Sequence, residues 1–311
     1  MRVVFWGTPE FAAPPLRALL GEGFDVAAVV TQPDKPVGRS RSKVEAPPVK
    51  QIAIEEGLRV LQPEKAKGDE AFAAQLREIA PDISIVVAYG QLLSKELIEL
   101  PRRGTLNIHA SLLPAFRGAA PIQAAILAGL TETGVTIMRM VPKLDAGPIV
   151  HQHRTPIAED ETGGELALRL SELGALALVE ALAMIEVGAA PERPQDEAAA
   201  TYAPKIDRDA TRIDWTKPAT EVARRIRAFD PRPGAFATHR EADLKVFGGR
   251  AMASMGTAEP GEITLIDANG MAVACGDGSV QITSVQPAGK RRLAPNELSN
   301  GRGIAVGERL F

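Results

Sequence analysis

Strands that alternate with helices are the feature that most restricts how this chain can fold. An apolar strand covers residues 2–7, a helical pattern covers 11–21, and a second strand covers 25–31. Parallel strands need a crossover of this kind, which is nearly always right-handed. The alternation continues to about residue 111. We therefore predict an α/β fold with a doubly wound, mostly parallel sheet.

The turn after the first strand limits the chemistry. It has one glycine, Gly7, and lacks the G-x-G-x-x-G pattern that binds dinucleotides. The sequence therefore gives no indication of a nicotinamide enzyme. We expect Thr8 to cap the following helix and Pro9 to occupy its first position.

A second module follows a change of composition near residue 187. Residues 188–205 contain several prolines, a glycine and a run of alanines, which is typical of a linker. Beyond a helix over 219–229, short apolar segments at 235–239, 244–247, 262–266, 271–274 and 280–285 are separated by turn sequences. That pattern indicates a small barrel. We predict an α/β domain at 1–187, a linker at 188–205 and an OB-like barrel domain at 206–311.

The composition excludes several classes of protein. The chain has 311 residues, of which 45% are hydrophobic, so two domain cores are expected. No apolar run approaches the roughly 18 residues that cross a bilayer, and the N-terminus lacks a signal-peptide pattern. The single cysteine, Cys275, excludes an intrachain disulfide and a multi-cysteine metal site. We expect a soluble cytoplasmic protein.

The charge is divided unevenly along the chain. Residues 205–311 carry 16 of the 36 basic and 13 of the 39 acidic side chains, a balance of +3. The 20 basic and 26 acidic residues before them give a balance of −6. A basic module on an acidic body is compatible with a polyanionic partner.

Asn107 and His109 lie near the end of a predicted strand, on one face of it because side chains alternate. An amide can donate a hydrogen bond to a developing oxyanion, and an imidazole can move a proton. Taken alone, the pair also fits an asparagine that caps a turn beside a buried histidine. Asp145 follows the strand at 133–141 and can approach His109 if the two strands are neighbours. A carboxylate there would orient the imidazole and favour its protonated form.

His151 and His153 share one face of a further strand. We find no third ligand at metal-like spacing and interpret both as structural. The sequence therefore predicts no metal cofactor.

The segment at 33–49 is longer than usual and rich in proline, serine and basic residues. Its composition argues against regular structure. It fits either a solvated, mobile loop or a loop that contacts phosphates, for which arginine is well suited. A second basic loop lies at 286–292.

Several motifs together resemble the formyltransferases that use 10-formyltetrahydrofolate. They lie at 107–109, 111–114, 117–121, 133–136 and 144–147, and the similarity extends to 7–9, 31–34, 87–90, 213–215 and 286–290. The first group is shared across the family. The loop at 33–49 and the C-terminal module resemble the branch that formylates methionyl initiator tRNA.

The resemblance implies a role for each motif. Asn107 and His109 would stabilise a tetrahedral oxyanion, and Asp145 would orient His109. The 10-formyltetrahydrofolate co-substrate would be bound by Tyr89, Gly90, Ser111, Leu112, Leu113 and Pro114. The tRNA would be contacted by Lys35, Arg39, Arg41, Lys43, Lys290 and Arg291. The resemblance implies no metal and no protein partner, and we expect a monomer.

Some alternatives stay open. A sugar-nucleotide formyltransferase acting on an aminoarabinose nucleotide has the same three residues and a small barrel. A non-catalytic RNA-binding protein comes from a different class. A glycinamide ribonucleotide formyltransferase would not need residues 205–311, and a hydrolase would use water in place of the amine. The chain also departs from the family motif at Phe116, where many members have tryptophan.

Overall fold

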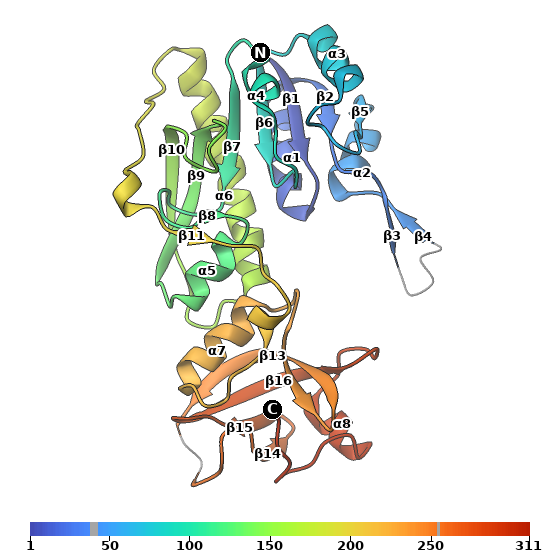
Figure 1. Cartoon of the computed structure of the whole chain (residues 1–311), viewed down its shortest axis with the longest axis vertical. Helices are drawn as coiled ribbons and strands as arrows, with labels where there is room; N and C mark the ends of the chain where they lie inside the picture. Colours follow the sequence, from blue (N-terminus) through green and yellow to red (C-terminus); the bar gives the residue numbers. More distant parts are fainter. Residues whose placement is uncertain (38–42, 254–255) are drawn as a thin grey trace. The chain divides into compact units, whose positions relative to one another are not determined.

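The computed structural model describes residues 1–37, 43–253 and 256–311, with only the backbone described at Val37 and Lys43. The chain forms two compact units that interleave along the sequence (Figure 1). The first unit comprises Met1–Gly118, Thr133–Thr155 and Ala167–Tyr202, and the second comprises Ala119–Glu132, Pro156–Leu166 and Ala203–Phe311. The linear boundaries predicted at 187 and 206 stay a prediction. Every described helix is too short or too polar to span a membrane.

A seven-stranded sheet forms the centre of the first unit. Its order is β10-β9-β7-β6-β1-β2-β5. The bounds are β1 Arg2–Gly7, β2 Asp25–Val30, β5 Val60–Leu61, β6 Ile83–Val87, β7 Thr105–His109, β9 Glu132–Arg139 and β10 Ile149–Pro156. Five neighbouring strands of the sheet, β7, β6, β1, β2 and β5, pair in parallel. Strand β9 pairs antiparallel to β7. The predicted mostly parallel sheet is confirmed.

Helices cover both faces of this sheet (Figure 1). The bounds are α1 Ala13–Gly21, α2 Pro48–Glu55, α3 Glu70–Ile79, α4 Lys95–Glu99 and α6 Gly163–Glu186, with the short 3-10 helix η1 at Glu10–Ala12. Asp69 begins α3 by accepting a hydrogen bond from the backbone N–H of Phe72. Helices α3 and α4 pack against the face that carries Trp6. On the other face, a side chain at Gly174 of α6 would crowd Ile108 of β7.

The predicted role of Thr8 as a helix cap is wrong. Pro9 is the N-cap of η1, and Ala12 precedes α1. The Thr8 hydroxyl instead donates to the carbonyl oxygen of Tyr89 at 3.0 Å and accepts from the backbone N–H of Gln32 at 3.3 Å. Thr8 follows the central strand β1, and its hydroxyl is used by residues just after the two neighbouring strands, β6 and β2, instead of by the helix.

The prediction that residues 33–49 lack regular structure is also wrong in part. Strands β3 (Lys35–Val37) and β4 (Lys43–Glu45) pair antiparallel as a short hairpin. Its base is anchored at Asp34, which accepts from Lys50 at 2.7 Å and from Gln62 at 2.7 Å. These bonds lower the pKa of Asp34, that of Gln62 contributing most. Lys50 therefore stabilises the base of this hairpin.

A five-stranded antiparallel sheet in the order β12-β13-β16-β15-β14 forms the body of the second unit. The bounds are β12 Ala235–His239, β13 Ala242–Met252, β14 Ile263–Asp267, β15 Gly270–Ala274 and β16 Ser279–Pro287. This unit also contains α5 Pro121–Leu127, η3 Asp209–Thr211, α7 Ala219–Ala228 and α8 Pro295–Asn300. All five predicted strands are confirmed, and α8 was not predicted. Cys275 is buried just after β15, and burial raises its pKa to about 12.

The C-terminal segment closes this sheet into the predicted barrel. Phe311 exchanges backbone hydrogen bonds with Thr238 of edge strand β12, at 2.8 and 2.5 Å. The same segment bonds the other edge, where the N–H of Ile263 donates to Glu308 and that of Leu310 donates to Gly261. The side chain of Leu310 is buried in the barrel core. The segment thus leaves neither edge strand with open hydrogen-bonding groups at these positions.

We expect Leu310→Ala to lower the free energy of unfolding by about 2–5 kcal/mol, because it leaves a cavity in the core and loosens the closing segment. Val306→Ala is the matched control, since Val306 is 58% exposed. It should change stability by less than about 0.5 kcal/mol. Urea denaturation followed by fluorescence would measure both. Equal effects of the two substitutions would refute the closing role of the segment.

Candidate active site

The end of β7 presents the two polar side chains that the sequence singled out. Asn107 lies between Val86 of β6 and Met138 of β9 in the sheet register, and His109 is opposite Thr136. Within the described residues, the half-buried side chain of Asn107 makes no hydrogen bond. An amide without a protein partner, two residues from a buried histidine on the same face, is available to a ligand.

His109 is held by its surroundings on both sides of the ring. Its Nε2 atom lies 2.9 Å from the carbonyl oxygen of Phe116, and a carbonyl only accepts, so Nε2 carries a hydrogen. Its Nδ1 atom lies 3.7 Å from Oδ2 of Asp145. That distance suits an ion pair and is too long for a hydrogen bond. Within the described residues, Nδ1 therefore faces the Asp145 carboxylate without a hydrogen-bond partner of its own.

Asp145 reaches His109 through a loop that folds back over the sheet. Strand β9 runs antiparallel to β7, so it passes His109 at Thr136 and ends at Arg139, opposite Leu106. At 3.3–3.4 Å per residue its end lies about 10 Å beyond His109. The return is tight at Gly147, where a Cβ atom would lie 1.8 Å from the carbonyl oxygen of Arg139. At the tip, Oδ2 of Asp145 accepts a hydrogen bond of 2.8 Å from the N–H of Gly118. The predicted approach of Asp145 to His109 is present in the structure.

Three residues other than glycine around this edge adopt left-handed backbone conformations. They are Ala88 after β6 (φ 47°), Phe116 (φ 58°) and Asp145 (φ 46°). Side chains other than glycine rarely adopt this region, and such strain is concentrated at functional sites. The strain at Phe116 and Asp145 accompanies the two contacts that hold His109.

Sequence reasoning missed a clamp beneath the Asp145 loop. Arg117, in the short strand β8 (Arg117–Gly118), is fully buried and donates to Gln195 at 2.8 Å and to Glu197 at 3.0 Å. Gln195 in turn donates to the carbonyl oxygens of Asp145 and Gly147, both at 2.8 Å. The region predicted as a linker, which contains η2 (Glu197–Ala199) and β11 (Tyr202–Ala203), thus supports the site. A buried arginine must find polar partners. The place of Arg117 in the family motif at 117–121 was the one feature of the sequence that pointed to this clamp.

The charges in this clamp are strongly coupled. Hydrogen bonds from Arg117 and then Lys143 lower the pKa of Glu197 to about 2. The bond to Glu197 is also the main cause that raises the pKa of Arg117. The pair therefore stays ionised at all physiological pH values.

The segment predicted to bind folate is fixed by a local hydrogen bond and by bonds to β9 and β10. Ser111 is buried and donates to the carbonyl oxygen of Ala115 at 2.5 Å. The N–H of Leu113 donates to Thr136, while Gln152 donates to the Leu113 carbonyl oxygen. Leu112 and Pro114 are partly exposed. These last two offer apolar surface, whereas Ser111 and Leu113 shape the loop.

Tyr89 and Gly90 lie at the carboxyl end of β6, at the same edge of the sheet. The ring of Tyr89 is buried against Trp6, with centroids 5.3 Å apart, and its burial raises the pKa to about 12. Its carbonyl oxygen accepts from Thr8 and from Gln32. A ligand here would meet the exposed backbone at Ala88 and Gly90 rather than the tyrosine ring.

The basic residues assigned to RNA are not brought together in one unit. Lys35 is exposed on β3 of the first unit, and Lys43 begins β4. Arg39 and Arg41 lie outside the described residues. In the second unit, Lys290 and Arg291 are exposed. Their neighbour Arg292 is committed to the fold, since it bonds Asp230 at 3.1 Å and stacks over Phe247.

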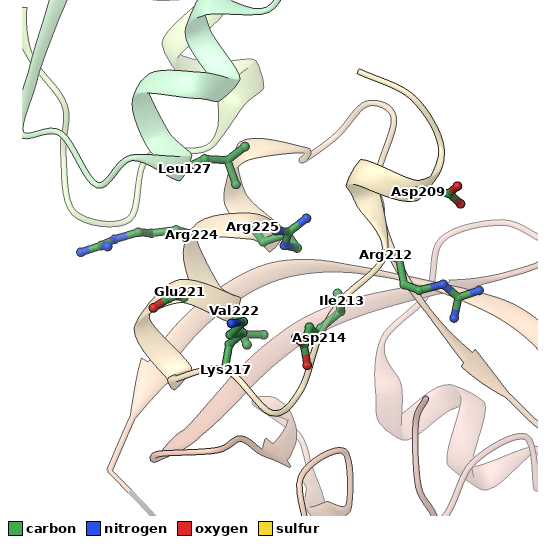
Figure 2. A pocket seen from close by; sticks show the side chains of 10 residues that line it. All are labelled: Leu127, Asp209, Arg212, Ile213, Asp214, Lys217, Glu221, Val222, Arg224 and Arg225. Atoms are coloured by element: carbon green, nitrogen blue, oxygen red, sulfur yellow. The ribbon is translucent and has the colours of Figure 1, made fainter. Parts of the chain in front are cut away.

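A pocket of 520 Å³ lies within the second unit, at the start of α7 (Figure 2). Basic and acidic side chains alternate around it, and it is lined by Leu127, Asp209, Arg212, Ile213, Asp214, Lys217, Glu221, Val222, Arg224 and Arg225. Several of these charges are satisfied internally: Asp214 accepts from Thr216, and Arg225 donates to Ala210. The pocket contains none of Asn107, His109 and Asp145.

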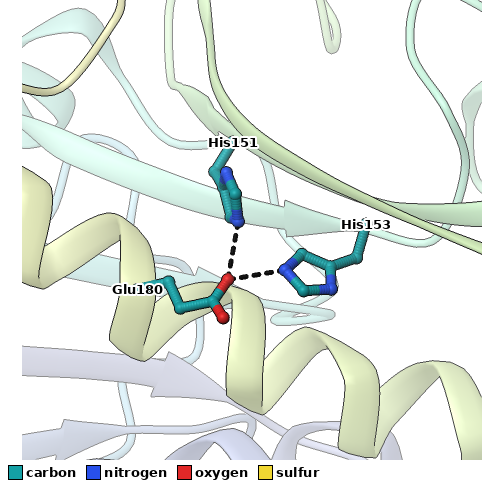
Figure 3. Close-up of side chains that lie close together, drawn as sticks. All are labelled: His151, His153 and Glu180. Carbon is teal, nitrogen blue, oxygen red and sulfur yellow. Dashed lines mark hydrogen bonds and ion pairs between the residues drawn. The ribbon is translucent and has the colours of Figure 1, made fainter.

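His151 and His153 face helix α6, where Glu180 lies between them (Figure 3). The sequence missed this third group because it is 27 residues beyond His153 and on another element.

Comparison with known proteins identifies the class. The family described as "Formyl transferase" matches residues 1–182, and "Formyl transferase, C-terminal domain" matches residues 205–303. The chain therefore belongs to the formyl transferase family. A relative named "Methionyl-tRNA formyltransferase" from Aromatoleum aromaticum is 47% identical over 99% of this chain and 96% of its own length.

Two solved structures share the fold. The structure of HypX from Aquifex aeolicus in complex with tetrahydrofolic acid has a TM-score of 0.70 at 20% identity over 99% of this chain. This chain spans about half of that protein, 48% of its length. WlaRD, a sugar 3N-formyl transferase, has a TM-score of 0.66 at 19% identity, covering 94% of this chain and 99% of that one.

The clamp gives a prediction for the pH dependence of stability. Because the pKa of Glu197 falls from 4.5 to about 2 on folding, its ion pairs stabilise the protein above pH 4.5 and are lost as the pH falls toward about 2. Glu197→Gln removes this contribution. The difference in stability between the two proteins should be largest near neutral pH and should shrink between about pH 4.5 and 2.

Chemical denaturation of both proteins across that range would measure the difference. A difference that is constant with pH would contradict the assignment of Glu197 to the clamp.

Proposed function

We propose that this chain transfers the formyl group of 10-formyltetrahydrofolate to the α-amino group of methionyl initiator tRNA. The observation that carries the proposal is the strand end of β7, where Asn107 has an open amide and His109 is held between Phe116 and Asp145. The relatives with this printed activity match over nearly the whole chain, both units included.

The proposed reaction develops negative charge on an oxygen, and the end of β7 offers hydrogen-bond donors for it. The amine nitrogen attacks the formyl carbon, and the carbonyl oxygen becomes an oxyanion. The bond from carbon to the folate nitrogen then breaks, and that nitrogen gains the proton that the amine loses. Asn107 would donate to the oxyanion, and stabilisation of this kind accounts for much of the rate enhancement in many acyl transfers.

His109 and Asp145 would act as a pair. A protonated ring carries a hydrogen on each nitrogen; Phe116 holds the one on Nε2, so the one on Nδ1 can face the oxyanion. The Asp145 carboxylate at 3.7 Å stabilises that positive charge and orients the ring. Such distances commonly shorten when substrate binds.

Gln195 would be a positioning residue. It ties the Asp145 loop to the buried guanidinium of Arg117 through hydrogen bonds of 2.8 Å on both sides. Shifts of about 1 Å in catalytic groups can lower rates about 100-fold, so this clamp would matter without touching substrate.

Folate would lie along the carboxyl edge of the sheet, where open α/β sheets bind ligands. The main chain at Gly90 and the apolar sides of Leu112 and Pro114 form that edge, with Ser111 and Leu113 supporting the loop. The chemistry of this donor set calls for no metal in the transfer.

The tRNA would be contacted by the basic hairpin of the first unit and by the loop of Lys290 and Arg291. Support comes from the exposure of Lys35, Lys290 and Arg291 and from the +3 charge balance of residues 205–311. We propose that the protein acts as a monomer in the cytoplasm, where charged initiator tRNA is used, and that it needs no protein partner.

The first test is transfer of labelled formyl from 10-formyltetrahydrofolate, with methionyl initiator tRNA, methionyl elongator tRNA, free methionine and an aminoarabinose nucleotide offered in parallel. We expect formylation of the initiator tRNA alone. Asn107→Ala should lower turnover by about 10²–10³ while retaining the fold, because one oxyanion donor is lost. Asn300→Ala, at an exposed position, is the matched control.

Formylation of the nucleotide would replace the proposal by the sugar-nucleotide alternative, which the fold likeness to WlaRD supports. Binding of tRNA without transfer would leave the non-catalytic RNA-binding alternative. A near-normal rate for folded Asn107→Ala would refute the role of that amide.

The second test concerns the phosphate contacts. Binding of tRNA should weaken steeply with salt, because each contact releases counterions. Lys290→Ala and Arg291→Ala should each reduce the slope of log K against log salt by about 1. Lys95→Ala is the control, since Lys95 lies on α4 and pairs with Glu99. A slope unchanged in all three variants would refute contact by the 286–292 loop.

A further inference from the structure

A group of three potential metal ligands lies on the α6 side of the sheet, and the proposed function does not use it. His151 and His153 come from edge strand β10, and Glu180 comes from α6 (Figure 3). The Nε2 atoms of the two histidines lie 2.7 and 2.5 Å from the same carboxylate oxygen, Oε2 of Glu180. The ligand atoms of the three residues all lie within 4.8 Å of one another.

This donor set has the chemistry of a zinc site. Two imidazole nitrogens and one carboxylate oxygen are the protein ligands of many tetrahedral Zn²⁺ centres, with a fourth position for water. Bonds of about 2.0–2.1 Å place neighbouring ligand atoms roughly 3.3 Å apart in a tetrahedron. The Glu180 carboxylate, 42% exposed, is free to withdraw by the required fraction of an ångström.

The hydrogen bonds of the group also suit a cation. Both imidazoles direct Nε2 at one oxygen, which means that two N–H groups share a single acceptor atom. A divalent ion would take the place of the hydrogens on the two Nε2 atoms, and each nitrogen would then donate its lone pair to the ion.

The group is separated from the proposed active site by the strand itself. Gln152, between the two histidines, points to the opposite face and donates to the Leu113 carbonyl and to Thr136. Side chains alternate along a strand, so His151 and His153 face α6 while Gln152 supports the 111–114 loop.

We propose that His151, His153 and Glu180 bind one divalent transition-metal ion of the Zn²⁺ class, which joins α6 to the edge strand β10. The ion adds a cross-link between the edge strand and the helix that follows it in the chain. It stabilises the folded state because this arrangement of ligands exists only after folding.

The test uses the full chain after dialysis against a chelator, titrated calorimetrically with Zn²⁺. We expect one tight site and, at a metal concentration of about 100 times Kd, a shift of about 100-fold in the folding equilibrium toward the folded state. Co²⁺ should bind with visible absorption bands of a four- or five-coordinate site. Mg²⁺ and Ca²⁺ should not compete, because they prefer all-oxygen sites.

The variants His151→Ala, His153→Ala and Glu180→Gln should each weaken Zn²⁺ binding by about 100-fold or more. His239→Ala is the matched control, because His239 pairs with Glu308 without a third ligand in the described residues. It should bind Zn²⁺ like the unchanged protein. All four variants should retain formyl transfer, since none of these residues lies at the β7 strand end.

Absence of Zn²⁺ binding in the unchanged protein at micromolar concentrations would overturn the proposal. Binding that survives all three ligand substitutions would overturn it as well, because the ion would then lie elsewhere.

Discussion

The antiparallel pairing of β7 with β9 is the constraint on which the proposed active site depends. Because β9 runs opposite to β7, the loop after β9 begins at the edge of the sheet away from the end of β7, where His109 lies. That loop must fold back to bring Asp145 to His109. Gly147 permits the close return, and the left-handed backbone at Asp145 turns the carboxylate toward the ring.

A loop that folds back over a sheet needs support, and Arg117 supplies it. The buried guanidinium requires acceptors, which it finds in Gln195 and Glu197. Gln195, held by Arg117, donates hydrogen bonds to two carbonyl oxygens of the loop. The N–H of Gly118, next to Arg117, holds the carboxylate itself. The geometry of the site is thus maintained by hydrogen bonds among segments that are far apart in the sequence.

Sequence reasoning succeeded where signals are local. Apolar segments located the strands of the central sheet and of the barrel, and turn residues separated the strands of the barrel. It failed where a side chain had to choose between partners. Thr8 is a residue type that often caps helices, yet its hydroxyl bonds the main chain of Tyr89 and Gln32 instead. The proline-rich composition at 33–49 concealed a hairpin whose base is braced by Asp34.

The α/β architecture, the barrel strands and the family could be predicted from the sequence alone, because periodicity and motifs are properties of short segments. The sequence also placed Asn107 and His109 on one face, since the period of a strand is two. Two contacts could be found only in the folded chain: Gln195 supports Asp145, and Glu180 bonds both His151 and His153. These contacts join separate elements, and their partners follow from packing that no local pattern encodes.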